Sequence, residues 1–397
     1  MNLKFLYLVL VIYSVSVGIL VTIIPLYSND LGANELTVGF VVSAYAMAYV
    51  AASPLWGKAS DLLGRKLALG IGMLGCSIVV PLFAVARDPS QIVVIRLLHG
   101  FTDASFWVVP TTIVADLHIS LERGIALGKI GVFQGIGFIV GPLLGGLLSQ
   151  QLNYFSVFYV CSALTFSTAL LVLFGLQETS KVHTKRNQSI ENPQPKFRVA
   201  KKYFTRAYFH TGLSAIFFGV IVSQFVLHTG EILGREYLVG FLLTIYYIVE
   251  TFIQPLAGRL SDTIGRNNTT LIAFISCALG FLILIFSSSL ASFLIAIIVI
   301  GGSIGGLYVS LTALLMDVAL NSQRGLIAGT QNIAWGIGYF LGPTIGGVAA
   351  AYSFSAAYML CVIASLIGGA STLLYDLGDK QEEKGGQYTS KERKMNA

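Results

Sequence analysis

The sequence predicts an all-α integral membrane protein in which twelve transmembrane helices form two homologous six-helix bundles. The first observation is composition: 55% of the 397 residues are hydrophobic and 11% are charged, against roughly 25% charged residues in a soluble domain. The second is a set of twelve apolar stretches of about 20 residues, the length that crosses a bilayer as a helix. The third is an internal repeat.

The repeat is clearest in a polar segment at residues 57–66, Gly-Lys-Ala-Ser-Asp-Leu-Leu-Gly-Arg-Lys, which interrupts the apolar sequence. It returns at residues 258–267 as Gly-Arg-Leu-Ser-Asp-Thr-Ile-Gly-Arg-Asn, an offset of 201 residues. The same offset relates Asp116 to Asp317. We therefore interpret the chain as a tandem duplication.

Each copy is expected to contain six helical spans, because a bilayer leaves no water to satisfy free backbone groups. The predicted spans are 4–26, 37–56, 67–86, 91–115, 125–149 and 155–176 in the first copy, and 208–228, 237–257, 269–286, 291–316, 326–350 and 354–375 in the second. The predicted domains are a first bundle at 1–176, a basic linker at 177–207, a second bundle at 208–376 and a disordered tail at 377–397. Each of the four cysteines falls in a different span and is expected to be a small buried hydrophobe.

The positive residues predict the topology. Placing both termini in the cytoplasm puts 22 of the 25 Lys and Arg residues on the cytoplasmic side, with Arg87 and Arg235 outside and Arg96 within a span. The linker alone carries eight Lys or Arg residues against Glu178 and Glu191. This basic strip either fixes the topology or adheres to anionic lipid. Because it is tethered to the membrane at both ends, nucleic-acid binding is not expected.

The repeated polar segments have the residues of a conformational latch. Glycines allow close approach of the backbone, while Asp61 can lie against the positive end of a helix or pair with Arg65 or Arg123. Gly57-x3-Asp61-x2-Gly64-Arg65-Lys66 resembles the loop 2–3 signature of the major facilitator superfamily of transporters, and its second copy matches except at Asn267. The latch residues expected from both copies are Gly57, Asp61, Gly64, Arg65, Lys66, Arg123, Gly258, Asp262, Gly265, Arg266 and Arg324.

A glycine pattern in the fifth span resembles the signature of the superfamily's drug–proton antiporters. Glycines at every fourth position pave one helix face for close packing, and the proline can bend the helix. The eleventh span carries the same pattern, so close packing between helices is an alternative to an antiport role. The residues are Gly128, Gly137, Gly141, Pro142, Gly145 and Gly146, with Gly338, Gly342 and Pro343 among their counterparts.

Apart from Lys4 and Lys129, which the topology assigns to the cytoplasmic side, three Asp, Glu, Lys or Arg residues lie inside predicted spans, namely Arg96, Asp103 and Glu250. Charges inside a membrane are costly, which makes all three candidates for proton coupling. Arg96-x3-Gly100 resembles the arginine motif of proton-coupled members of the superfamily, although Arg96 could instead reach the headgroups. Each acid could instead be a protonated carboxyl that hydrogen-bonds to a neighbour. The 201-residue equivalents of Asp103 and Glu250 are Ile304 and Tyr49, so neither acid is duplicated.

The resemblance implies a central cavity lined by the first, fourth, seventh and tenth spans. The candidate substrate-cavity residues are Trp107, Phe217, Gln224, Ser303 and Tyr308, and Ser14, Thr22 and Thr312 lie on the same spans. An aromatic, weakly polar lining with one acid would suit amphipathic or cationic organic molecules better than phosphates.

These observations predict a secondary active transporter in the plasma membrane, working by alternating access and exporting small amphipathic or cationic molecules in exchange for protons. The alternative is a proton-coupled uptake symporter or a facilitator for a small metabolite. No phosphate-cradling loop or His/Cys/Asp cluster occurs in the sequence, so neither an enzyme nor an ATP-driven pump is expected. The expected partners are a small-molecule substrate, protons and the lipid bilayer, and we expect a monomer without cofactor, metal or nucleic acid.

Overall fold

The computed structural model describes residues 3–117, 120–179, 197–319 and 324–395. Within them, twelve helical segments are long and apolar enough to cross a membrane. The first six consist of α1 (Leu3–Asp30), α2 (Glu35–Leu63), α3 (Arg65–Val79) continued by the 3-10 helix η1 (Val80–Val85), α4 (Pro89–Leu117), α5 (Ser120–Gln151), and α6 (Tyr154–Leu170) continued by the π-helix η2 (Leu171–Gly175).

The second six repeat this order. One span consists of α7 (Phe197–Val220), the π-helical turn η4 (Ile221–Phe225) and α8 (Val226–Leu233), followed by α9 (Glu236–Ile264), α10 (Arg266–Ile285), α11 (Leu290–Val318), α12 (Arg324–Ala350) and α13 (Phe354–Met395). The prediction of an all-helical membrane protein with twelve spans is confirmed.

Short polar caps and single glycines set the helix boundaries. The side chain of Asn34 accepts a hydrogen bond from the amide of Thr37 and begins α2, and Ser289 begins α11 through a capping box. Gly64 and Gly265 separate the helices on either side with φ values of +97° and +91°, a region that L side chains rarely adopt. Equivalent turns in the two copies therefore depend on equivalent glycines.

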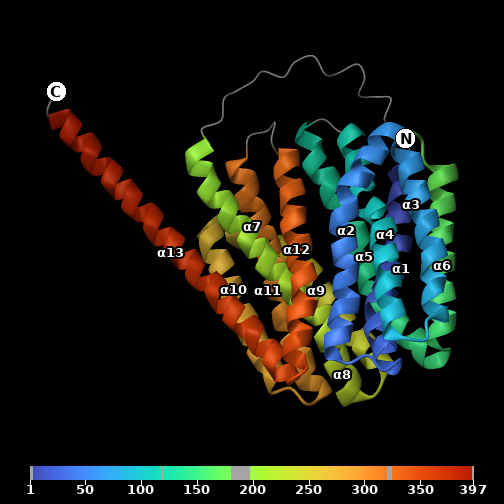
Figure 1. Cartoon of the computed structure of the whole chain (residues 1–397). Coiled ribbons are helices and arrows are strands. Elements are labelled where there is room, and N and C mark those ends of the chain that lie inside the picture. Colours follow the sequence, from blue (N-terminus) through green and yellow to red (C-terminus); the bar gives the residue numbers. More distant parts are fainter. Residues whose placement is uncertain (1–2, 118–119, 180–196, 320–323, 396–397) are drawn as a thin grey trace.

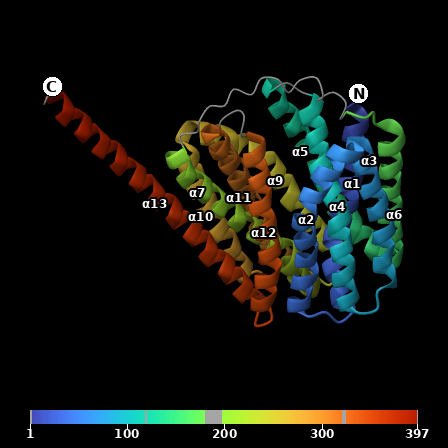
Figure 2. The same cartoon turned by 45° about the horizontal axis from the view of Figure 1, so that its top comes forward.

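The helices gather into a first half, α1–α6, and a second half, α7–α13 (Figure 1). We call the end that carries Gly64 and Gly265 the linker face, because α6 ends and α7 begins there, and we call the opposite end the far face. The N-terminus and the end of α13 both lie toward the linker face, as Figure 2 also shows.

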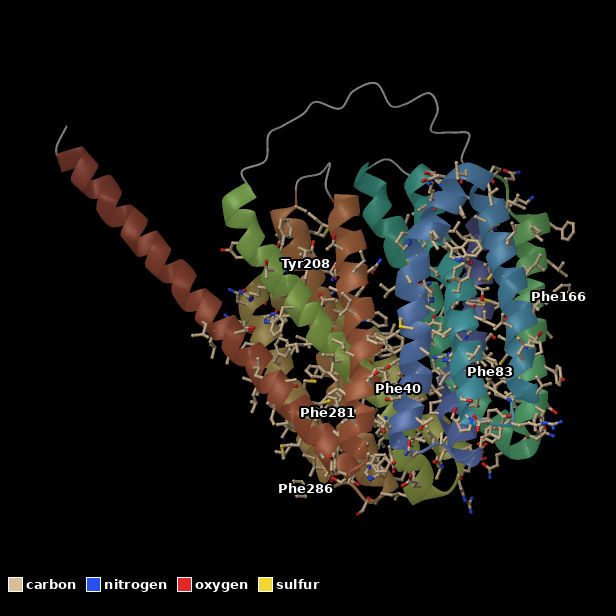
Figure 3. The ribbon with its side chains drawn as sticks, viewed as in Figure 1. Phe40, Phe83, Phe166, Tyr208, Phe281 and Phe286 are labelled. Atoms are coloured by element: carbon tan, nitrogen blue, oxygen red, sulfur yellow. The ribbon has the colours of Figure 1, made fainter. Side chains whose placement is uncertain are left out.

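Apolar side chains divide between the interior of each half and its surface. Phe83 and Phe281 are fully buried in the cores of the first and second halves, while Phe166 and Phe286 are 47% and 78% exposed and project outward (Figure 3). Exposed phenylalanines on such helices are what a surface in contact with lipid requires. All four cysteines are free and buried, as predicted.

The structure differs from the prediction in two segments. Helix α7 begins at Phe197, inside the segment predicted as linker, and residues 180–196 lie outside the described residues. Helix α13 continues to Met395 through the segment predicted as a disordered tail, and it leaves the bundle as it does so (Figure 1). Lys, Glu and Gln, which dominate that segment, have high helix propensity, and this outweighs its two adjacent glycines.

Candidate functional site

The polar segment between α2 and α3 is organised around Arg65. Its guanidinium forms an ion pair with Asp61 on α2, and its Nε lies 2.9 Å from Oδ2 of Asp116 at the end of α4. The carboxylate of Glu178, at the start of the linker, accepts hydrogen bonds of 2.9 Å and 3.1 Å from the amides of Arg65 and Lys66. These contacts tie together three helix ends of the first half, and they satisfy two free amides at the positive end of α3.

The second copy repeats the arginine contacts with greater exposure. Arg266 lies 2.5 Å from Asp262 and 2.9 Å from Asp317. The side chain of Asp317 is 55% exposed, whereas that of Asp116 is 4% exposed. The side chains of Arg123 and Arg324 lie outside the described residues. These four ion pairs all join helix ends within one half, and a latch between the halves stays a prediction.

The glycine motifs lie where helices approach most closely. Gly137 and Gly141 pack against the backbone of α1, and Gly338 and Gly342 pack in the same way against α7. A Cβ added at Gly146 would collide with the backbone of Glu236, across the boundary between the halves. The motif therefore serves close packing, both within a half and between the halves, and the antiport role stays a prediction.

Contacts between the halves toward the far face follow the duplication. Gly39 lies against the carbonyl oxygen of Pro343, and its equivalent Gly240 lies against that of Pro142. Two hydroxyl groups, also 201 residues apart, donate to carbonyl oxygens of the opposite half: Ser43 to Phe340 at 2.7 Å, and Thr244 to Ile139 at 2.8 Å. Helices α2 and α12, and equally α9 and α5, close this end of the bundle.

Toward the linker face the same helices diverge. Going from the far face toward the linker face, close contacts between the halves continue as far as two pairs. These pairs are Val50 with Gly336 and Thr251 with Gly135. Nearer the linker face, a Cβ added at Gly128 or Gly329 would meet no heavy atom within 4 Å. Among the described residues, the close contacts between the halves therefore lie toward the far face.

Asp103 lies at the middle of α4 and is completely buried in the first half. Tyr13 of α1 donates a hydrogen bond of 2.6 Å to Oδ1, and Tyr45 of α2 donates to Oδ2. The indole Nε1 of Trp107 lies 3.3 Å from Oδ2 and 3.0 Å from the Tyr45 hydroxyl oxygen. Each carboxyl oxygen thus accepts at least one hydrogen bond, and the three donors come from three different helices. Such hydrogen bonds stabilise a buried carboxyl group without an ion pair.

Arg96 lies closer to the far face on the same helix and does not reach the bilayer surface, since it is 5% exposed. Its guanidinium carbon lies 4.5 Å from the centroid of the Tyr45 ring, within cation–π range, and its Nε donates to the Val41 carbonyl at 3.3 Å. It also borders a small cavity between the halves, where Tyr339 of α12 is its neighbour. Tyr45 therefore connects Arg96 to Asp103.

Glu250 lies at the middle of α9 in the second half and is partly accessible. Among the described residues its carboxylate forms no ion pair and accepts no hydrogen bond. Tyr246 and Tyr247, one turn earlier, are buried, and their hydroxyl groups also lack partners in this part of the chain. The two acids therefore have opposite environments, one saturated with donors and one open.

Aromatic rings connect these two acids around the boundary between the halves. The path runs from Tyr45 to Tyr339, Phe218, Tyr246, Tyr247, Phe138 and Trp107, with successive ring centroids 5.0–6.4 Å apart, and the Trp107–Tyr45 hydrogen bond closes it. We call these seven residues the aromatic ring. Six helices, three from each half, contribute to it.

The predicted cavity residues occupy different positions. Trp107 belongs to the aromatic ring, and Tyr308 of α11 is 52% exposed. Gln224 is buried toward the far face, where its Nε2 donates to the Glu35 carbonyl at 3.2 Å. Ser303 is 3% exposed and bonds to its own helix. Phe217 packs against Phe274 and Phe281 in the core of the second half, so its placement gives no support to a cavity role.

Sequence reasoning missed Tyr13, Tyr45 and Tyr339, because uncharged tyrosines in apolar spans carry no signal by themselves. The duplication offered one: Tyr45 and Tyr246 are 201 residues apart, as are Phe138 and Tyr339. All four belong to the aromatic ring. Searching the repeat for paired aromatic residues would have identified these four.

Comparison with known proteins supplies the family. The model of the Major Facilitator Superfamily matches residues 6–238 and again residues 207–394. Multidrug resistance protein 2 of Bacillus subtilis (strain 168) is 25% identical over 373 residues, covering 90% of this chain and 91% of that protein. Multidrug resistance protein MdtG of Salmonella arizonae (strain ATCC BAA-731 / CDC346-86 / RSK2980) is 26% identical over 366 residues, covering 87% of both.

Solved structures agree on the fold. A bacterial homologue of the human lysosomal transporter Spinster, in an inward-facing and unoccupied conformation, superposes with a TM-score of 0.76 at 14% identity, covering 94% of this chain and 95% of that one. The nucleoside transporter NupG gives a TM-score of 0.76 at 16% identity, covering 94% and 99%. At these identities the likeness concerns the fold alone.

Proposed function

This chain belongs to the Major Facilitator Superfamily and is a transporter of that family, and we propose that it exports small amphipathic or cationic organic molecules in exchange for protons. The multidrug resistance proteins of Bacillus and Salmonella, similar over nearly the whole chain, support export of drug-like molecules. The aromatic ring at the boundary between the halves supports the same substrate class, since aromatic faces bind both apolar bodies and cations.

The proposed orientation places the linker face in the cytoplasm of a cell bounded by its plasma membrane. The excess of Lys and Arg in the segments at that face supports it. In this orientation the close contacts between the halves lie toward the outside, as expected of an inward-facing state. An exporter must pass through such a state to collect its substrate from the cytoplasm or the inner leaflet.

The observation that carries the proposal is a pair of carboxyl groups at the middle of the membrane, one in each half, without an ion pair among the described residues. Asp103 and Glu250 are these groups, and Arg96 reaches the first of them through Tyr45. A carboxylate in a low-dielectric site favours either a proton or a cationic partner. Competition between proton and substrate for such a group couples their movements as the two halves rock about it.

The experiment that tests the proposal is transport by the purified full chain in sealed proteoliposomes with an imposed pH difference. An exporter of this kind concentrates the lipophilic cation tetraphenylphosphonium against its gradient while protons move the opposite way. Movement of substrate in the same direction as protons would identify a symporter. Equilibration that ignores the pH difference would identify a facilitator.

A further inference from the structure

Carboxyl groups gather at the far face in a pattern that follows the duplication. Asp30 ends α1 and Glu35 begins α2. Their equivalents 201 residues later are Glu231 in α8 and Glu236 at the start of α9. Asp30 interacts electrostatically with Glu236 of the opposite half. Glu231 interacts in the same way with Glu35. Two pairs of carboxyl groups therefore span the boundary at the end where the halves are in close contact.

A tyrosine joins one of these pairs. Tyr154, the first residue of α6, donates a hydrogen bond from its hydroxyl group to Oε1 of Glu236, across the boundary between the halves. The carboxyl group of Asp30 lies beside the same hydroxyl group. The residue equivalent to Tyr154 in the second half is Ser355, so a tyrosine is present in one pair only. The two pairs therefore have the same positions and different surroundings.

Packing holds Glu236 against the first half. A Cβ added at Gly146 of α5 would come within 2.4 Å of the Glu236 carbonyl oxygen and 2.8 Å of the Cα of Tyr237. The side chain of Glu236 is half-buried, and its Oε2 is inaccessible and accepts no hydrogen bond from the described residues. Water therefore screens a charge at Glu236 less than it screens one at Glu231, which is exposed.

The hydrogen bond assigns different states to the two acids of this pair. Tyr154 has one hydroxyl proton and gives it to Glu236, as suits an ionised carboxylate. Asp30 therefore stands beside a negative charge, and an ionised Asp30 repels it. The other titratable groups around the pair are Tyr27, whose ring centroid lies 5.2 Å from that of Tyr154, and Arg235, which is exposed and compensates little. The halves are thus easier to close when Asp30 carries a proton.

We propose that Asp30 is a proton-binding switch for the far face. With a proton on Asp30 the halves stay in contact there, and when the medium at that face removes the proton, Asp30 and Glu236 repel and the halves separate. The proposal goes beyond the proposed function, because it concerns a surface pair instead of the membrane-centred acids and requires no substrate. In the proposed orientation, an acidic exterior holds the outer end closed.

The test measures the separation of the halves at the far face in the purified full chain in lipid nanodiscs. Spin labels are attached through Val85→Cys and Phe286→Cys, two positions 201 residues apart that end η1 and follow α10 and are 64% and 78% exposed. The labelled parent also carries Asp103→Asn and Glu250→Gln, so that these two acids do not titrate. Pulsed electron paramagnetic resonance gives the distribution of distances between the labels, and hence the ratio of closed to open molecules.

Raising the pH from about 5 to about 9 should lower the closed-to-open ratio of the parent about tenfold, as for a proton that binds the closed state tenfold more tightly. Asp30→Asn, which resembles the protonated acid, should have the same ratio at both pH values. Glu231→Gln, the matched change at the equivalent position, should keep the dependence of the parent. Tyr154→Phe, which keeps the ring and removes the donor to Glu236, should lower the ratio at the higher pH by about tenfold.

Each outcome decides for or against the switch. A parent whose distances ignore pH, or a pH dependence that Asp30→Asn leaves unchanged, would overturn the proposal. Loss of the dependence in Glu231→Gln would overturn its assignment to the pair that Tyr154 joins. Should Asp30→Asn not fold, Glu236→Gln removes the other charge of the pair and must abolish the dependence instead. Because these distances are measured without substrate or a pH difference across the membrane, failure of proton-coupled export would leave the result standing.

Discussion

The hydroxyl group of Tyr45 donates a hydrogen bond to Oδ2 of Asp103, and the same tyrosine ring lies beneath the guanidinium of Arg96. One side chain from α2 thus joins the two ionisable groups of α4, which are too far apart along the helix to form a direct pair. Tyr339 of α12 lies edge-on to the same ring, 6.2 Å between centroids, so the second half also touches this connection. A change in the contact between halves can therefore reach Asp103 through Tyr45.

Tyr45→Phe should separate these two roles. It removes the hydrogen bond to Asp103 and the acceptor for Trp107, while the ring that faces Arg96 remains. We expect a loss of about 1–3 kcal/mol in stability, the cost of a hydrogen bond to a carboxyl group, and a changed pH dependence of transport. Thermal unfolding and transport at several pH values measure both. Tyr49→Phe is the control, and an identical effect of both variants would contradict the role of Tyr45.

The far-face contacts predict a matched pair of glycine variants. Gly39→Ala places a Cβ against the carbonyl oxygen of Pro343, whereas Gly329→Ala places one in open space. Overpacking of this kind costs about 1–3 kcal/mol, and here it opposes only the state in which the far face is closed. Gly39→Ala should therefore slow transport severely and make a cysteine introduced at the far-face end of the boundary between the halves accessible to labelling from outside. Normal transport by Gly39→Ala would show that this contact is not needed for closure.

The latch predicts a difference between two aspartates. Asp61→Asn should impair the transport cycle more than folding, because an exposed ion pair or helix-dipole contact is worth only ~0.3–1 kcal/mol. Asp262→Asn should impair transport less than Asp61→Asn does. Its partner Arg266 also pairs with Asp317, which is more exposed than Asp116, and the second copy ends in Asn267 where the first has a lysine. The measurement is the transport rate of each variant, normalised to the amount of protein inserted in the membrane. Full activity of correctly inserted Asp61→Asn would remove the latch role.

The proposed topology is tested by labelling with a membrane-impermeant thiol reagent in intact and opened cells. The four native cysteines are buried, which leaves a low background. Cysteines introduced by Ser189→Cys and Ser390→Cys should react only after the cells are opened, and Asn29→Cys should react in intact cells. Reaction of Ser189→Cys in intact cells would reverse the orientation.

The fold was predictable from the sequence because apolar length and the 201-residue offset are properties of the chain alone. The latch pair of Asp61 with Arg65 was predictable for the same reason, since the two residues are only four positions apart, on either side of the turn at Gly64. The surroundings of Asp103 were not, because Tyr13 and Tyr45 come from other helices and depend on how those helices are rotated. The same rotation places Phe218, and not its neighbour Phe217, in the aromatic ring. Glu178 was counted only as a charge of the linker, although it caps α3.

The strongest prediction concerns the two acids together. Asp103→Asn and Glu250→Gln should each abolish accumulation driven by a pH difference, because a neutral amide can neither take up nor release the coupling proton. Both variants should still carry triphenylphosphine oxide down its own gradient, since the neutral probe needs no charge at either site. Asp103→Asn also tests the hydrogen-bond network, because an amide nitrogen cannot accept from Tyr13 or Tyr45 as a carboxylate oxygen does. Proteoliposomes loaded with buffers of different pH measure both activities. If both variants still concentrate tetraphenylphosphonium against its gradient, proton coupling resides elsewhere in the chain, and the paired carboxyls at the membrane centre do not drive transport.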